Sequence, residues 1–153
     1  MRLVAVGQRP PAWVSAGFTE YARRLPRDMA LHLTEISPAP RKNVPVQRAR
    51  GMEGERLLQQ VGPGDCVVAL DVTGVQWSTP QLAQHMDDWR MQGQDVAFLV
   101  GGADGLASEC LERADRVWSL SALTFPHALV RVILAEQLYR AWTLLSGHPY
   151  HRA

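Results

Sequence analysis

The sequence predicts an α/β domain built around a mostly parallel sheet. Five short apolar runs alternate with stretches whose apolar residues recur at helical spacing, which is typical of strands joined through helices. Two of these runs, CVVAL (66–70) and VAFLV (96–100), are apolar throughout, as expected for strands covered on both faces. The chain has 153 residues and contains no repeat, linker or low-complexity segment, so a single domain over residues 1–153 is expected.

The first half of the chain is expected to supply three strands and two helices. Residues 2–7 (RLVAVG) form a buried strand by their Val and Leu content, and two prolines at 10 and 11 open a helix that runs to about Leu25. The next segments are a second strand over 29–36, a helix from about Val44 to Val61, and the third strand over 66–70. Gly51 and Gly54 weaken the middle of the second helix.

The second half adds two strands and three helices. Thr79 and Pro80 start a helix to about Met91 by cap and first-position preferences. The following segments are a strand over 96–100, the glycine-rich GGADG, a short helix over 108–114 and a strand over 116–120.

A loop over 121–127 then leads into the longest helix of the chain. Apolar residues recur along this helix at Val130, Ile133, Leu134, Leu138, Ala141, Trp142 and Leu145. Pro126 can pre-set its first turn, and Gly147 is a fitting stop after Ser146.

Composition leaves the partner open. Hydrophobic residues make up 46% and charged residues 20%, which excludes a disordered chain. The net charge of +1 does not advertise nonspecific nucleic-acid binding, although 15 of the 16 cationic residues are Arg. Four basic positions are plausible phosphate contacts, or equally a solvated helix face: Arg41, Lys42, Arg48 and Arg50. No apolar run is long enough to predict a membrane span.

The two cysteines predict buried thiols. Cys66 lies in an apolar strand and Cys110 in a helix, and such isolated positions do not form a disulfide framework. A reducing compartment, the cytoplasm, is therefore expected.

Two loops are candidate ligand sites. GGADG (101–105) joins a buried strand to a helix, where glycine lets the backbone approach a nucleotide or an acidic group, but a plain turn is as plausible. The loop 121–125 offers hydroxyls at Ser121 and Thr124 and could wrap a heterocycle, or serve only as a crossover. Neither loop carries a dinucleotide fingerprint or the lysine of a P-loop, so NAD and ATP phosphates are not indicated.

The carboxyl tail concentrates His148, Tyr150, His151 and Arg152, residue types suited to a substrate. A metal site is disfavoured because no third ligand stands near the two histidines. Imidazole titrates near neutral pH, which makes His151 a candidate general base; the alternative is an idle terminus.

The helix before this tail predicts a homodimer. It is apolar nearly all round from 128 to 135, interrupted only by Arg131, so it is buried within the fold or against a second copy. Arg131 and Arg140 are then candidates for an interface site, although Glu136 and Arg140 could also be an ordinary surface ion pair.

Seven segments together resemble one family: LVAVG, GFTEY, LDVTG, VGGADGL, WSLSALTFPH, LVRVILAEQLYRAW and HPYHR. They are similar, essentially from end to end, to the bacterial RlmH proteins, ribosomal RNA large-subunit methyltransferases of the SPOUT (α/β-knot) class. The chain departs from the family at Ala103 and Asp104, where members often carry Pro-Glu.

This resemblance implies a parallel-sheet SPOUT fold whose carboxyl-terminal segment threads a trefoil knot. It also implies a homodimer and S-adenosylmethionine as methyl donor, with transfer to N3 of a pseudouridine in 23S rRNA of the assembled ribosome. By similarity the donor would contact Leu70, Gly101, Gly102, Leu120, Ser121, Ala122, Leu123, Thr124 and Phe125.

The implied reaction needs loss of the N3 proton and alignment of nitrogen, methyl carbon and sulfur. We expect the tail of one subunit to close over a donor pocket, either its own or the partner's. His151 would then assist proton removal, Tyr150 would orient the base and Arg152 would engage an anion, with Arg140 as a further catalytic candidate. A different nucleotide-using α/β enzyme and a noncatalytic ribosome- or RNA-binding module are the alternatives.

Overall fold

The computed structural model describes the backbone of residues 1–152 and the side chains of residues 1–150. Its centre is a five-stranded sheet in the order β2-β1-β4-β3-β5, and every pairing is parallel. The strands are β1 (Arg2–Val6), β2 (His32–Ile36), β3 (Cys66–Gln76), β4 (Val96–Val100) and β5 (Arg116–Ser119). The predicted α/β class with a parallel sheet is confirmed, and both all-apolar strands lie inside the sheet.

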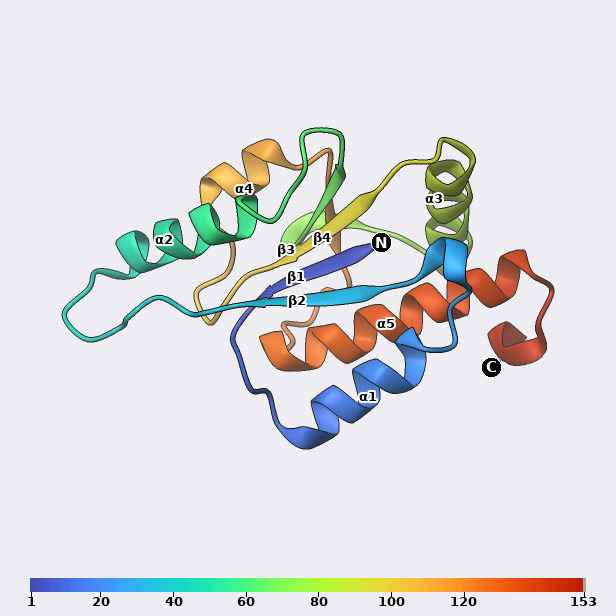
Figure 1. The fold of residues 1–153 in the computed structure, drawn as a ribbon, viewed down its shortest axis with the longest axis horizontal. Helices are drawn as coiled ribbons and strands as arrows, with labels where there is room; N and C mark the ends of the chain where they lie inside the picture. Colours follow the sequence, from blue (N-terminus) through green and yellow to red (C-terminus); the bar gives the residue numbers. More distant parts are fainter. Residues whose placement is uncertain (153) are drawn as a thin grey trace.

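Five α-helices cover the two faces of the sheet (Figure 1). They are α1 (Ala12–Ala22), α2 (Val46–Leu58), α3 (Thr79–Met91), α4 (Ser108–Arg113) and α5 (His127–Leu145), with short 3-10 turns at Arg27–Met29 and Pro149–Arg152. One hydrophobic cluster joins α1, α3 and α5 to one face, and a smaller cluster joins α2 and α4 to the other. Among the described residues, no helix is both long and apolar enough to cross a membrane.

Prolines and a capping box begin the helices. Pro11, Pro45 and Pro126 are the N-caps of α1, α2 and α5, where a missing N–H costs nothing. For α3 the cap is Ser78, not Thr79 as the sequence suggested. The Ser78 amide donates to Gln81 Oε1 at 2.8 Å, and the Ser78 hydroxyl accepts from the Gln81 amide at 3.4 Å.

Two strand boundaries differ from the prediction. Met29 lies in a 3-10 turn, so β2 begins only at His32. The third strand runs six residues past Leu70, because the chain bulges over 71–74 and then pairs with β5 again: Trp118 is opposite both Leu70 and Val75. The mostly polar and small residues at 71–76 do not predict this second pairing with β5.

Gly74 makes this return possible. A Cβ atom on Gly74 would lie 2.6 Å from the carbonyl carbon and oxygen of Val117, which is closer than real Cβ contacts. The backbone of β5 therefore passes directly against residue 74. Gly147 directly follows Ser146, the C-cap of α5. Its φ of +68 is the left-handed conformation expected of a glycine that stops a helix.

Candidate functional site

A cavity of about 650 Å3 opens at the carboxyl edge of the sheet. Its walls are the strand ends and the β3 bulge, the turn 101–105, and the loop 120–126 with the first turn of α5. The volume is within the range of small-molecule sites, and open parallel sheets bind their ligands at this edge. The site expected from the two loops is therefore one hollow rather than two.

Eight of the nine residues expected around the methyl donor line this cavity: Leu70, Gly101, Gly102, Leu120, Ser121, Leu123, Thr124 and Phe125. Ala122 belongs to the same loop but is not among the lining residues. The structure thus gathers three separate chain segments around one hollow. Donor binding by these residues stays a prediction.

The sequence reasoning missed other residues that line the cavity, notably Asp71, Val100, Ser119, His127 and Val130. Asp71 begins the bulge of β3, Val100 and Ser119 end β4 and β5, and His127 and Val130 lie in the first turn of α5. The signal that could have found them is topological, because the carboxyl ends of neighbouring parallel strands meet at one edge.

The GGADG turn is shaped by its own backbone. The Gly105 amide donates to the Gly102 carbonyl at 3.1 Å, and Gly105 has φ +78. A Cβ atom on Gly101 would lie 2.4 Å from the carbonyl carbon of Gly105. Glycine at 101 is thus required by the turn itself. The segment is a tight turn that also lines the cavity, and ligand binding by it stays a prediction.

The loop over 120–126 is also held by local hydrogen bonds. The Ser119 hydroxyl donates to the Ser121 carbonyl at 2.9 Å, and the Ser121 hydroxyl accepts from the Leu123 amide at 3.0 Å. Leu123 is nevertheless 71% exposed. The loop therefore has a defined path while presenting an apolar side chain at the rim of the cavity.

Arg131 lies inside the fold, and its prediction as an interface residue is wrong. Its side chain is almost fully buried and donates to the carbonyl oxygens of Val6 at 3.1 Å and Gly7 at 2.7 Å. It also forms an ion pair with Glu35. One cation of α5 therefore ties down the carboxyl ends of β1 and β2 beside the cavity.

Glu136, Arg140 and Tyr150 form a half-buried cluster on α5. Arg140 donates to Glu136 Oε1 through Nε at 2.9 Å and Nη2 at 2.6 Å, and the guanidinium carbon lies 5.0 Å from the centre of the Tyr150 ring. Burial, followed by a hydrogen bond with Tyr21 and the charge of Glu136, raises the pKa of Tyr150. The phenol stays protonated at neutral pH and can act as a donor, not as a base.

The described part of the tail lies at the far end of α5 from the cavity. His127, in the first turn of α5, lines the cavity, whereas Tyr150 packs 4.8 Å from the ring of Tyr139, three turns further on. At 1.5 Å per residue the two positions on the helix are about 18 Å apart. The side chains of His151 and Arg152 lie outside the described residues, so their predicted roles stay predictions.

Within the part of the chain that is described, no group of three or more His, Cys, Asp or Glu could hold a metal.

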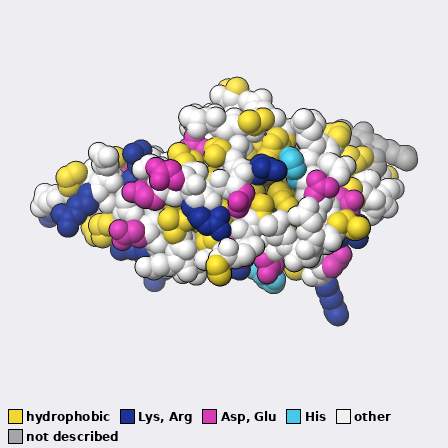
Figure 2. Space-filling model, turned by 90° about the horizontal axis from the view of Figure 1, so that it is seen from above, with side chains coloured by type: hydrophobic (Ala, Val, Ile, Leu, Met, Phe, Trp, Pro, Cys, Tyr) yellow, Lys and Arg dark blue, Asp and Glu magenta, His cyan; other side chains and the backbone are white. Residues whose placement is uncertain are grey.

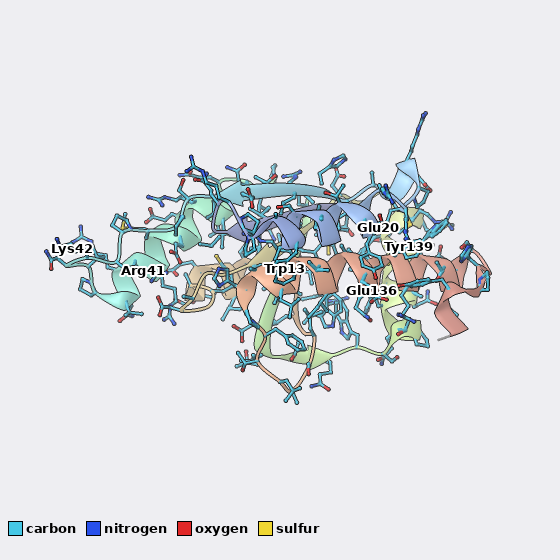
Figure 3. The ribbon with its side chains drawn as sticks, turned by 90° about the horizontal axis from the view of Figure 1, so that it is seen from below. Trp13, Glu20, Arg41, Lys42, Glu136 and Tyr139 are labelled. Carbon is cyan, nitrogen blue, oxygen red and sulfur yellow. The ribbon has the colours of Figure 1, made fainter. Side chains whose placement is uncertain are left out.

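The basic positions of the loop before α2 and its first turns lie at one end of the molecule. Figure 2 shows Lys and Arg side chains gathered at this end, and Figure 3 shows Arg41 and Lys42 there. Lys42 and Arg48 are exposed and Arg50 is half-buried. Arg41 differs from them because its guanidinium is ion-paired with Glu53 and Asp104. A solvated face and a phosphate-binding surface both remain consistent with the other three.

Comparison with known proteins agrees with this fold. Residues 1–151 match the family described as "Predicted SPOUT methyltransferase". A probable methylase family protein from Haemophilus influenzae Rd KW20 has a similar structure, with a TM-score of 0.54 over 97% of this chain and 69% of that one at 15% identity. A putative methylase family protein from Neisseria gonorrhoeae has a TM-score of 0.50 over 90% and 80% at 13% identity. The match to this family model over nearly the whole chain makes the protein a member of the SPOUT methyltransferase family.

Relatives of higher identity are more specific. The chain is 60% identical to the ribosomal RNA large subunit methyltransferase H of Hahella chejuensis, over 99% of this chain and 98% of the relative. It is 56% identical to the protein of the same name from Methylococcus capsulatus, over 99% of both chains. The chain belongs to the family of ribosomal RNA large subunit methyltransferase H, as its seven sequence segments indicated.

Proposed function

We propose that the protein transfers a methyl group from S-adenosylmethionine to N3 of a pseudouridine in the large-subunit rRNA of the assembled bacterial ribosome. The observation that carries the proposal is the cavity at the carboxyl edge of β4 and β5, lined by eight of the nine expected donor contacts. The full-length match to relatives named for rRNA methylation gives the substrate class. A ribosomal substrate implies a cytoplasmic enzyme.

The cavity suits the donor in size and in lining. Its volume of about 650 Å3 accommodates a nucleoside with an amino-acid side arm. Leu70, Val100 and Val130 would offer apolar contacts to the donor, and the turns 101–105 and 120–126 would offer it backbone hydrogen-bonding groups. When bound, the sulfonium supplies an electrophilic methyl group.

The protein's own residues must align the substrate and accept its proton. The N3 imide is largely protonated at neutral pH, so a base must act before or during attack. We assign the role of proton acceptor to His151. Tyr150 and Arg140 would orient the pseudouridine ring, and Arg152 would bind phosphate or the developing anion. The raised pKa of Tyr150 supports an orienting role, because the phenol keeps its proton.

A homodimer would complete the site, because the tail of a subunit lies about 18 Å along α5 from its own cavity. Two exposed apolar sets suit a second copy. Val72, Val75 and Leu123 are 64%, 68% and 71% exposed around the β3 bulge and the cavity rim. Trp13 is 59% exposed on α1, which lies beside α5 on the face that Figure 3 shows. The trefoil knot implied for the segment after β5 is part of the same proposal.

The decisive experiment uses methyl-tritiated S-adenosylmethionine with intact ribosomes, separated large subunits and naked rRNA. We expect label in the large-subunit RNA only when intact ribosomes are present. Ribosome binding without label would identify a noncatalytic module instead. A melting-temperature shift with NAD or FMN, and none with S-adenosylmethionine, would identify another nucleotide-using enzyme.

A further inference from the structure

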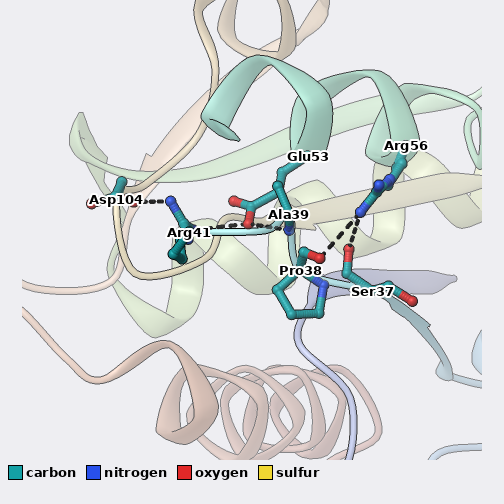
Figure 4. A network of polar contacts seen from close by, with 7 residues as sticks. All are labelled: Ser37, Pro38, Ala39, Arg41, Glu53, Arg56 and Asp104. Carbon is teal, nitrogen blue, oxygen red and sulfur yellow. Dashed lines mark hydrogen bonds and ion pairs between the residues drawn. The ribbon is translucent and has the colours of Figure 1, made fainter. Parts of the chain in front are cut away.

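We propose that Arg41 is a positioning residue for the donor cavity and that it holds the turn 101–105 from behind. Its guanidinium joins two carboxylates from different elements, Glu53 of α2 and Asp104 of the turn (Figure 4). The inference rests on the proposed function, because the position of this turn matters to the reaction only if the cavity holds the methyl donor.

The anchor of this arrangement is a buried carboxylate. Glu53 is 1% exposed, and its Oε1 accepts from the Ala39 amide at 2.9 Å and from Arg41 Nη2 at 2.8 Å. Its other oxygen, Oε2, has no hydrogen-bond partner among the described residues. A buried carboxylate is costly unless it is paired. Arg41 supplies the charge that makes this one tolerable.

The wall of the cavity rests on this ion pair. A Cβ atom placed on Gly102 would lie 3.0 Å from Glu53 Oε2 and 3.5 Å from Arg41 Nη2, so the backbone of the turn passes directly over both groups. Two residues later, Asp104 forms an ion pair with Arg41 Nη1. The turn is therefore fixed at Gly102 by contact and at Asp104 by charge, while Gly101 and Gly102 face the cavity.

Arginine suits this task better than lysine. The two ends of one planar guanidinium reach two carboxylates at the same time, whereas an ammonium is a single point charge. Because both Nη atoms are already engaged, Arg41 is removed from the set of candidate phosphate ligands. Its neighbour Lys42 is exposed and has no ion pair with any residue that the structure describes, which makes it a matched control.

The experiment separates positioning of the turn from stability of the fold. Four variants are compared with the wild type: Arg41→Lys, Asp104→Asn, the double variant Arg41→Gln with Glu53→Gln, and the control Lys42→Gln. Three quantities are measured for each: the Kd of S-adenosylmethionine by calorimetry, the Tm, and amide hydrogen exchange across 101–106.

We expect Asp104→Asn and Arg41→Lys to weaken donor binding about fivefold, the size of a partly exposed ion pair, with the Tm nearly unchanged. The double variant removes the buried charge together with its partner, so it should keep most of the Tm and still show the weaker binding. Exchange across 101–106 should be faster in all three, and Lys42→Gln should match the wild type.

Wild-type donor affinity and wild-type exchange in Asp104→Asn and Arg41→Lys would overturn the inference. Losses of affinity that follow the Tm from variant to variant would also overturn it, because they would reflect general stability. A wild type that fails to bind the donor would overturn the proposed function. In that case the exchange data still decide whether Arg41 holds the turn.

Discussion

The hydroxyl of Tyr150 donates a hydrogen bond to Oε1 of Glu136 at 3.1 Å, and this bond docks the tail on the last turns of its own α5. Arg140 binds the same oxygen and covers the Tyr150 ring. The tail therefore starts from a defined place rather than from solvent. In this position the Tyr150 ring packs on Tyr139, about 18 Å along α5 from His127 at the cavity.

Deleting residues 150–153 should lower methyl transfer to ribosomes by at least about a hundredfold, the usual contribution of a positioned acid or base. The Kd of S-adenosylmethionine should stay within about twofold, because the described residues that line the cavity all come from positions 70–130. Single-turnover labelling and calorimetry measure the two quantities. Unchanged turnover in the truncated protein would exclude a catalytic role for the tail.

Changing Tyr150 to Phe tests the hydrogen bonds of the hydroxyl group, which joins Glu136 and Tyr21. The ring keeps its contacts with Tyr139 and Arg140, but Glu136 loses one donor. We expect a small loss of stability, about 1 kcal/mol, because Arg140 still neutralises the carboxylate. A fall in methyl transfer much larger than the loss of stability would show that the hydroxyl also acts on the substrate.

Two glycines in α2 should respond to alanine in opposite directions. A Cβ atom on Gly51 would meet nothing within 4 Å. A Cβ atom on Gly54 would lie 2.6 Å from the Cβ of Ala107, which is the N-cap residue of α4. Gly51→Ala should stabilise the protein by about 0.5–1 kcal/mol through helix propensity. Gly54→Ala should destabilise it by about 1–3 kcal/mol through overpacking.

Urea unfolding of the two variants checks this pair directly, and each serves as the control for the other. A stabilising Gly54→Ala would mean that α2 and α4 can move apart at no cost, contrary to their close packing. The sequence places both glycines correctly in a helix but treats them alike. Only the neighbouring helix distinguishes them.

The same limit explains how far the sequence could be read. Periodicity and prolines located all five strands and five helices, because these depend on local chemistry. The strand-end rule made the GGADG turn a candidate ligand site, whereas the full set of expected donor contacts came from the family resemblance. The sequence could not show that β3 returns to pair with β5 past Gly74, since that contact joins residues more than 40 positions apart. The sequence also made Arg131 a candidate for a dimer interface, because a single cation in an apolar helix gives no sign of the carbonyl groups that bind it.

Arg131 should be among the residues whose replacement costs most. Changing it to Met removes the donors of two strand-end carbonyl groups and the partner of Glu35, so we expect a loss of about 3 kcal/mol in the free energy of unfolding. Arg90→Met, which breaks an exposed pair with Asp87, is the control and should have little effect. Equal effects in the two variants would contradict the role of Arg131 as a buried tie.

The raised pKa of the Cys110 thiol leads to a prediction about stability at alkaline pH. Burial, assisted by the charge of Glu109, raises the pKa of Cys110 from its ordinary value of 9.0 to about 11. Because the folded state holds this proton more tightly, the associated stability is complete below pH 9 and is lost as the pH rises through about 11. Cys110→Ala has no such proton, so it should show a shallower decline over this range.

The measurement is the difference in free energy of unfolding between the wild type and Cys110→Ala, followed by urea unfolding from pH 8 to pH 11. This difference should fall by roughly 1 kcal/mol per pH unit above pH 9, because a folded pKa above the unfolded one makes unfolding release a proton. The thiol lies 3.6 Å from the Gly54 carbonyl at the contact of α2 with α4. A difference that stays constant with pH would show that the thiol ionises as readily in the folded protein as in the unfolded chain, and would contradict its sealed position between these helices.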